Sequence, residues 1–374
     1  MEPGLWSYAF IAFVAAVVTW ATVPATQRLA YRTGAVAEPD ARRVHQWPTP
    51  TLGGLAMLTG VLVAVGVASL LGGFDPIFAS SRAVLGILAS AVCIYSVGFI
   101  DDLFEVSAPA KMAGLVLAGS ILTMSGVSIV YFRVPFSGLV VLSADLSALV
   151  TVLWVIGMAN AVNLVDGLDG LAAGIVAIAA GALFIYTAQL SGRDLLRPDN
   201  PSPLIAAAVV GVCLGFLPHN FHPARTFMGD GGALLLGLLM AAATISVGGQ
   251  SRAQFSGQTY FFFAPLLIPL FILGVPIFDL AFAIVRRARR RSGVATADKG
   301  HLHHRLMNLG HGQRRSVLIL WAWTALLSAV VLYPTITGKG DGLVLIAILA
   351  LALLLFTYFH PGVRAHRREA HTER

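Results

Sequence analysis

The chain has 374 residues, of which 57% are hydrophobic and only 11% are charged. Soluble domains carry about 25% charged residues, so this composition excludes an ordinary soluble enzyme, and its wealth of apolar residues excludes a disordered chain. The net charge of +7 does not call for a nucleic-acid partner, because basic cytoplasmic loops give membrane proteins the same excess.

Long apolar runs dominate the chain. A helix needs about 20 apolar residues to cross the hydrocarbon core of a bilayer. Eleven runs of at least 18 residues lack Asp, Glu, Lys and Arg: 3–27, 44–74, 83–100, 112–132, 146–165, 170–192, 200–224, 231–251, 253–278, 316–338 and 342–363. We therefore predict an all-α polytopic membrane protein with about eleven transmembrane helices. The run 134–144 is too short to cross and is expected to form an outer loop or a short interfacial piece.

The basic residues predict the orientation. With the N-terminus outside and the C-terminus cytoplasmic, 19 of the 25 Lys and Arg residues fall on the inner side. The first run follows Glu2 rather than a basic segment, which indicates an anchored helix rather than a cleaved signal peptide. We expect one integral membrane domain over 1–374, with a basic, His-containing cytoplasmic loop at 286–315 and a short polar tail at 364–374.

Acidic residues gather at the inner ends of the runs. Asp101 and Asp102 end the third run, Asp166 and Asp169 follow the fifth, and Asp230 precedes the eighth. All five fall on the inner face, although the orientation was set by basic residues alone. The sequence thus predicts that acids from three separate connections meet on one surface.

The chemistry of these groups points to a cation and a diphosphate. Adjacent carboxylates repel one another, and an oxygen-rich cluster suits Mg²⁺, with Mn²⁺ as an alternative. Lys111, His301, His303 and His304 lie on the same predicted side. Simpler roles stay open: Asp169 and Asp230 can cap helices, and the histidines can face anionic lipid. Asp279, near the inner end of the ninth run, is either functional or part of a salt bridge.

Five stretches of the sequence form an ordered set of motifs from about residue 42 to 315. They are Arg43-Val-His45 to Pro50 with Gly53-Gly54, Gly98-Phe-Ile-Asp-Asp102, Asn160 to Gly170, Asn220 to Gly231, and Asp298-Lys-Gly-His-Leu-His-His-Arg-Leu306. In these motifs the sequence resembles the polyprenyl-phosphate N-acetylhexosamine-1-phosphate transferases of bacterial membranes, glycosyltransferase family 4. One departure is Ala233, where many members of the family carry Ser.

The His-Leu-His-His-Arg-Leu stretch looks like the UDP-N-acetylglucosamine branch of the family. The resemblance implies transfer of GlcNAc-1-phosphate from UDP-GlcNAc to undecaprenyl phosphate or another polyprenyl phosphate, with release of UMP, as the first membrane step of an envelope glycan pathway. The alternatives are a phospho-MurNAc-pentapeptide transferase, which uses the same chemistry on another donor, and a cation-coupled transporter. A transporter places its ionisable residues near the bilayer midplane, whereas here the acids collect at one face.

The resemblance also implies roles for individual residues. Asp230 is expected to be the strongest metal ligand. Asp101 would activate the lipid phosphate, with Asp102 supporting the metal or the base, so these three are both the catalytic and the metal-binding candidates. Direct transfer and a covalent aspartyl intermediate both stay open. The candidate substrate-binding residues are Lys111, Asn160, Asn163, Asp166, Asp169, Asn220, His301, His303, His304, Arg305, Arg43 and His45.

The same resemblance sets the expected surroundings. It implies a multi-pass protein of the plasma (inner) membrane with its active site on the cytoplasmic face and membrane lipid around it. The family's precedent favours a homodimer. The downstream glycan pathway is left open by the sequence.

Overall fold

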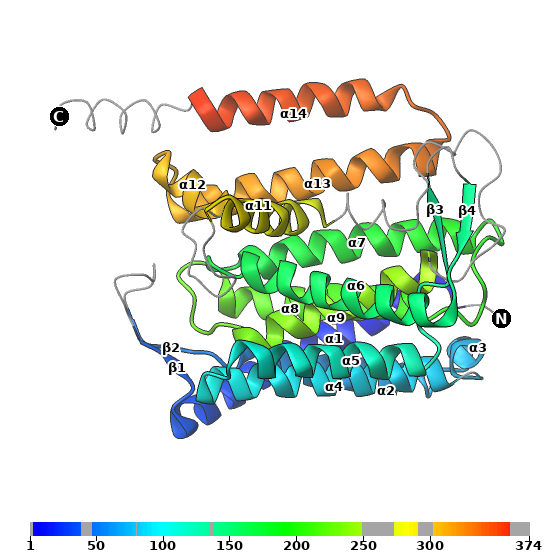
Figure 1. Ribbon diagram of the computed structural model, residues 1–374, viewed down its shortest axis with the longest axis horizontal. Coiled ribbons are helices and arrows are strands. Elements are labelled where there is room, and N and C mark those ends of the chain that lie inside the picture. Colours follow the sequence, from blue (N-terminus) through cyan, green and yellow to red (C-terminus); the bar gives the residue numbers. More distant parts are fainter. Residues whose placement is uncertain are drawn as a thin grey trace.

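The computed structural model is a bundle of long helices (Figure 1). It describes residues 3–38, 47–79, 81–134, 138–248, 273–290 and 302–359. Long helices follow from the apolar runs, because a segment in lipid must satisfy its own backbone N–H and C=O groups. The prediction of an all-α polytopic membrane protein is confirmed.

The helices alternate with short connections along the chain. Several ends are set by local sequence: α1 stops at Gly34, which takes a left-handed conformation with φ of 78°, and the Ser143 hydroxyl accepts a hydrogen bond at the start of α6. The helices are α1 (Leu5–Thr33), α2 (Gly53–Ala68), the 3-10 turn η1 (Gly72–Phe74), α3 (Asp75–Ala79), α4 (Ser81–Phe104), α5 (Ala108–Met124), α6 (Ala144–Val165), α7 (Leu171–Ser191), α8 (Ser202–Asn220), α9 (Gly229–Gly248), α11 (Gly274–Arg290), α12 (Leu302–Asn308), α13 (Gln313–Thr337) and α14 (Gly342–Phe359).

Two small antiparallel hairpins mark opposite ends of the bundle (Figure 1). The first joins β1 (Val36–Ala37) to β2 (Thr49–Pro50), with Val36 opposite Pro50. The second joins β3 (Tyr131–Val134) to β4 (Gly138–Val141), with Tyr131 opposite Val141. The second hairpin occupies the stretch that was expected to form an outer loop, at the end away from β1 and β2.

The described parts of the predicted runs are mostly helical, although β2 lies in the run 44–74 and the start of β3 in the run 112–132. Eight described helices are long and apolar enough to span a membrane: α1, α4, α6, α7, α8, α9, α13 and α14. The run 44–74 contains α2 and η1, and the chain bends by 92° between α2 and the helical stretch Gly72–Ala79, which comprises η1 and α3. The run 112–132 contains the shorter α5. Most of the run 253–278 lies outside the described residues. The count of eleven spans and the orientation of the chain in the membrane stay predictions.

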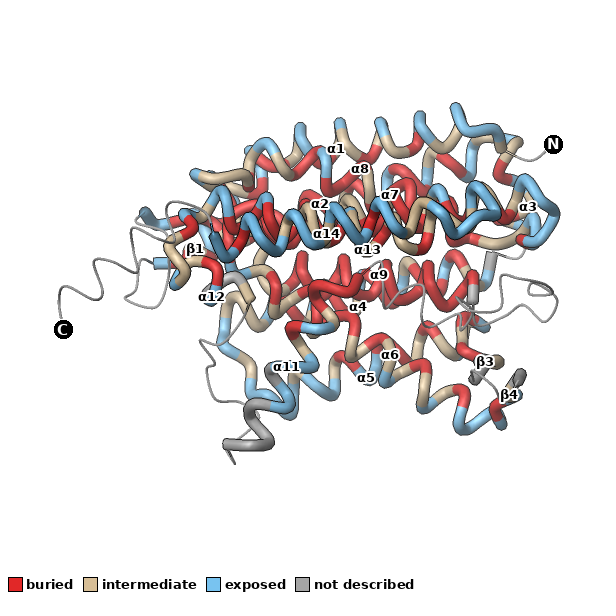
Figure 2. Tube along the Cα trace, turned by 90° about the horizontal axis from the view of Figure 1, so that it is seen from above, coloured by how far each residue is buried: buried red, intermediate tan, exposed pale blue. Residues whose placement is uncertain are grey.

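Helix α9 forms the centre of the bundle. In its apolar stretch 94% of the residues are buried, against 6% in α14, which lies at the edge of the bundle and packs mainly on α13 (Figures 1 and 2). Around α9 stand α2, α4, α6 and α8. Asp230 therefore lies in the first turn of the most enclosed of the eight described membrane-length helices, with other helices packed around it.

A glycine brings α4 close to the start of α9. A Cβ on Gly98 would lie 2.5 Å from the Cα of Gly231 and 2.6 Å from the carbonyl carbon of Asp230. Small residues at such crossings let helix backbones approach each other in membranes. The approach places Asp101 and Asp102, at the end of α4, beside the first turn of α9.

Candidate active site

The centre of the site is an ammonium group between two carboxylates. Lys111, near the start of α5, donates to Asp101 of α4 at 2.7 Å and to the carboxylate of Asp230 of α9. Asp101 also accepts the backbone N–H of Val106 at 2.8 Å, which fixes its second oxygen. Residues from three helices thus meet, and their contacts join two of the three connections whose acids were predicted to converge, although 119 positions separate Lys111 from Asp230.

Asp102 binds the N-terminus of α9. Its two carboxylate oxygens accept the backbone N–H groups of Asp230 at 2.9 Å and of Gly231 at 3.2 Å. The first N–H groups of a helix lack partners within the helix and carry partial positive charge, so a carboxylate there is stabilising. Gly229, with φ of 67°, leaves room for this carboxylate. The capping group of α9 is therefore Asp102 from another helix, while the Asp230 carboxylate contacts Lys111.

Two groups from the end of α6 complete the cluster. The Asn163 side chain donates to Asp230 at 2.9 Å. Asp166, three residues on, is half-buried. Its pKa is raised to about 8, because burial strips water from the carboxylate and the charges of Asp230, Asp102 and Asp169 oppose its ionisation. Among the described residues of this cluster, several carboxyl groups therefore surround the single ammonium group of Lys111.

A second group of contacts joins the α6–α7 connection to the α8–α9 connection. The carboxylate of Asp169 accepts from His222 Nδ1 at 2.7 Å and from the backbone N–H of Ala224 at 3.1 Å. Asn220 accepts from the N–H of Gly170 at 3.0 Å and donates to the carbonyl of Thr226 at 2.9 Å. Asp169 does not cap α7, because Gly170 holds that position without a side-chain bond.

Several candidate residues lie elsewhere or beyond the description. The Asn160 side chain donates to the carbonyl of Ile156 in its own helix at 2.8 Å, so it does not join the cluster in this arrangement. Arg43, His45 and His301 fall outside the described residues. His303 and His304 belong to α12, but their side chains are outside the description.

Asp279 contacts the start of α12. This buried residue of α11 accepts the backbone N–H of Leu302 at 3.0 Å, where α12 begins. It therefore anchors the helix that carries His303, His304 and Arg305. The sequence had left its role open between function and a salt bridge.

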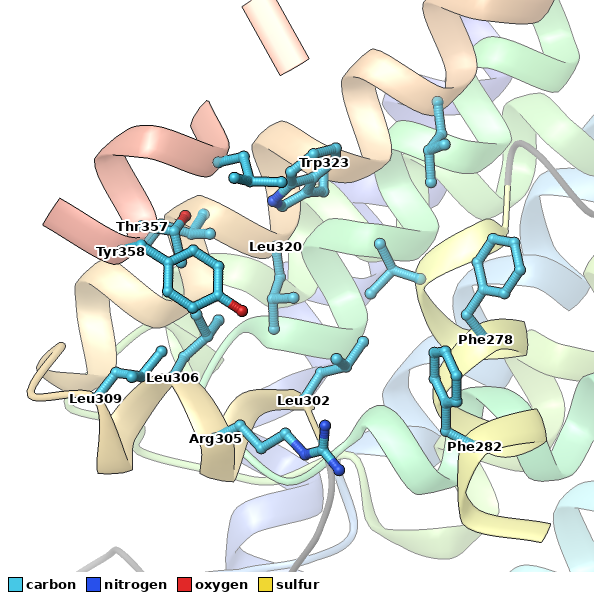
Figure 3. A pocket seen from close by; sticks show the side chains of 14 residues that line it. Phe278, Phe282, Leu302, Arg305, Leu306, Leu309, Leu320, Trp323, Thr357 and Tyr358 are labelled. Carbon is cyan, nitrogen blue, oxygen red and sulfur yellow. The ribbon is translucent and has the colours of Figure 1, made fainter. Parts of the chain in front are cut away.

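An apolar cavity of about 530 Å³ opens between α11, α12, α13 and α14. Figure 3 shows Phe278 and Phe282 of α11 across from Leu306 and Tyr358, with Arg305 at one edge. Leu306 belongs to the same hydrophobic cluster as Val165 and Leu168, the residues that flank Asp166. Through Leu306 the cavity wall therefore belongs to the same hydrophobic cluster as residues on both sides of Asp166.

The donor set suits a magnesium ion that is shared with a phosphate. The described residues contain no group of three His, Cys, Asp or Glu side chains already arranged around a metal position. Mg²⁺ seldom uses such a cage; it takes one or two carboxylates and fills its other positions with water and substrate phosphate. Asp230, Asp101 and the half-buried Asp166 offer that kind of partial, oxygen-only shell.

Fold and site together define a multi-pass membrane protein whose polar centre lies at one end of its helices. Residues 84–248 match Glycosyl transferase family 4 and include Asp101, Lys111, Asn163, Asp166 and Asp230. The chain belongs to this family and is an enzyme of the transferase class.

Curated relatives cover most of the chain. It is 40% identical over 327 residues to decaprenyl-phosphate N-acetylglucosaminephosphotransferase of Mycobacterium tuberculosis, covering 86% of this chain and 80% of the relative. It is 36% identical over 312 residues to the probable undecaprenyl-phosphate N-acetylglucosaminyl 1-phosphate transferase of Bacillus subtilis, covering 83% and 80%. Phospho-N-acetylmuramoyl-pentapeptide-transferase of Desulforudis audaxviator is 33% identical over 351 residues, covering 88% and 97%.

Sequence reasoning missed His222. The residue lies inside a motif stretch that was recognised, but between the asparagine and the Met-Gly-Asp segment that drew the assignment. A histidine beside a proline in a connection carries no signal by itself. Its contact with Asp169 spans 53 positions and appears only in the folded chain.

Proposed function

We propose that the chain transfers GlcNAc-1-phosphate from UDP-GlcNAc to undecaprenyl phosphate or another polyprenyl phosphate, releasing UMP. We further propose that the reaction takes place at the cytoplasmic face of the plasma membrane. The observation that carries this proposal is the meeting of Lys111, Asp101 and Asp230 at the start of the central helix. The names of the relatives from M. tuberculosis and B. subtilis support both the acceptor and the sugar.

The reaction joins two anions, so the site must neutralise charge. An oxygen of the lipid phosphate attacks the sugar-bearing phosphorus, and the bond from that phosphorus to the oxygen of UMP breaks, so UMP leaves with the electron pair. Lys111 offers a compact positive charge to a phosphate. Asp101, fixed by Lys111 and by the N–H of Val106, orients the attacking group. The lipid phosphate is mostly a dianion near neutral pH, because its second pKa is about 6, so positioning contributes more than proton removal.

Asp230, Asp101 and Asp166 are the residues that would hold Mg²⁺, which supplies charge neutralisation and polarises the phosphorus under attack. Asn163 keeps the Asp230 carboxylate in place through its 2.9 Å hydrogen bond. Asp102 keeps the first turn of α9 in place through two backbone contacts. Because some acids would hold the metal ion and Asp102 holds the start of α9, the site needs several acids within one small volume.

The acceptor also needs an apolar surface near the acids. The cavity of about 530 Å³ lies within the usual size range of small-molecule sites and is lined almost entirely by apolar side chains (Figure 3). Its lining residue Leu306 belongs to the same hydrophobic cluster as Val165 and Leu168, which lie on either side of Asp166 in the sequence. We propose that it takes part of the polyprenyl chain, with the phosphate directed toward the acidic end.

The alternative donor is UDP-MurNAc-pentapeptide. The relative named for phospho-N-acetylmuramoyl-pentapeptide transfer aligns over 351 residues. Both candidates share acceptor and chemistry and differ in the sugar. The 40% identity to an N-acetylglucosamine transferase favours UDP-GlcNAc.

The test is UMP release by purified protein in detergent. The protein receives Mg²⁺, a polyprenyl phosphate and, separately, UDP-GlcNAc or UDP-MurNAc-pentapeptide. We expect turnover with UDP-GlcNAc, loss of turnover in excess EDTA and loss in Asp230→Asn. Asp145→Asn, at the far end of α6, is the matched control. Turnover with the pentapeptide donor alone would assign the other donor, and near-native activity of Asp230→Asn would remove the metal assignment.

A further inference from the structure

The connection between α8 and α9, residues 221–228, sets the position of Asp230. Its second half is fixed to the β2–α2 region, because Thr226 Oγ1 donates to the carbonyl of Pro50 at 3.0 Å and the N–H of Gly54 donates to the carbonyl of Met228 at 3.0 Å. Its first half has different contacts. That half holds His222, which no motif singled out.

His222 ties this connection to the one after α6. Its Nδ1 donates to the Asp169 carboxylate at 2.7 Å, and the N–H of Ala224 donates to the same oxygen at 3.1 Å. Asp169 is only 8% exposed, so little water competes for it. The Arg314 guanidinium donates to the His222 carbonyl at 3.1 Å, which holds the backbone from which the ring projects.

The tie joins the two connections that form the cluster. Asn163 and Asp166 lie shortly before Asp169 in the chain, whereas Asp230 follows the connection 221–228 that contains His222. The hydrogen bond from Asn163 to Asp230 at 2.9 Å requires the two connections to keep their register. A hydrogen bond to a charged group is short and strong, so it suits this purpose.

We infer that His222 is a positioning residue for the transfer reaction, whose ring N–H holds Asp169 and thereby sets Asp230 against Asn163. The inference rests on the proposed function. It concerns one nitrogen of the ring, Nδ1, and one oxygen of Asp169. The side chain of His222 is 36% exposed, so its replacement removes the hydrogen bond without opening a large core cavity.

Three single variants separate the bond from general packing. In His222→Asn the amide nitrogen lies near the position of Nδ1, in His222→Gln it lies near Nε2, and His222→Ala has no donor. We expect His222→Ala and His222→Gln to lower kcat/KM for UMP release by about tenfold or more, mainly through kcat, and His222→Asn to retain activity within about threefold of wild type. Asp169→Ala combined with His222→Ala should be no worse than Asp169→Ala alone, because both remove one interaction.

Melting temperatures of all variants accompany the rates. Wild-type activity in His222→Ala, or equal loss in His222→Asn and His222→Ala together with a matching drop in melting temperature, overturns the positioning role. A double variant that multiplies the two single losses also overturns it. Wild-type protein that releases no UMP with any UDP-sugar overturns the proposed function and this inference with it, which distinguishes the two failures.

Discussion

Gly98 offers a direct test of how closely α4 and α9 must approach. In Gly98→Ala the new Cβ would lie 2.5 Å from the Cα of Gly231, whereas ordinary contact begins at 3.4 Å, so the helices must separate by about 0.9 Å. Asp102 is one helical turn further along α4, on the same face. Its contacts to the start of α9, at 2.9 and 3.2 Å, would lengthen beyond hydrogen-bonding range.

The expected effect is large on rate and moderate on stability. A displacement of about 1 Å in a reacting constellation can cost about 100-fold in rate, while overpacking a core costs about 1–3 kcal/mol. We therefore expect Gly98→Ala to remain folded and to lose about 100-fold in kcat for UMP release. The measurement is steady-state release of UMP together with a thermal melt in detergent.

Gly157→Ala on α6 is the matched control, because a Cβ there meets nothing within 4 Å. It adds the same methyl group to a helix of the same bundle and should leave both rate and melting temperature unchanged. Equal activity of the two variants would refute the claim that the α4–α9 approach positions the acids.

Three further outcomes follow from the site and its cavity. Lys111→Met leaves the carboxylates without their ammonium partner and should lower kcat/KM about 100-fold or more, whereas Lys339→Met in the connection before α14 should have no effect. In EDTA the free energy of unfolding should fall as pH rises from about 4 to 8. The pKa of Asp166 is raised to about 8 in the folded protein, against about 3.9 in the unfolded chain. Over that range only the folded state keeps the proton, so rising pH favours the unfolded state. Asp166→Asn should flatten the melting-temperature profile, and an unchanged slope would contradict this origin. Leu354→Trp, which narrows the cavity from α14, should raise KM for the polyprenyl phosphate and spare KM for UDP-GlcNAc; Leu351→Trp, exposed and outside the cavity lining, is its control, and equal effects of the two would count against the cavity as acceptor site.

Much of the site was predictable because acidic residues at the ends of apolar runs can be recognised in the sequence. Acids at the ends of apolar runs are costly unless they serve a purpose, and the basic residues assigned all of them to one side. The contacts of Lys111 with Asp101 and Asp230 confirm that the acids of two of these connections meet. The division of labour among them was not predictable. Asp102 was expected to support metal or base, and in the fold its two oxygens bind the start of α9.

Neighbours in a motif did not share one environment. Asn160 and Asn163 stand three positions apart on α6, yet Asn163 reaches Asp230 and Asn160 bonds its own helix. Arg305, expected to grip sugar or diphosphate, stands at the edge of an apolar cavity. Periodicity places residues on a helix face, but it does not say which helix that face will meet.

The positions of the long helices, and the end of the helices that carries the acids, can be predicted from the sequence. Both properties are local, because about 20 consecutive apolar residues suffice for a span and each flanking charge acts on its own segment. Only the folded chain shows that Asp102 binds the N–H of Asp230, 128 residues later at the start of α9, and that His222 holds Asp169. These contacts depend on how closely the helices pack, and the missing Cβ at Gly98 lets α4 approach the start of α9.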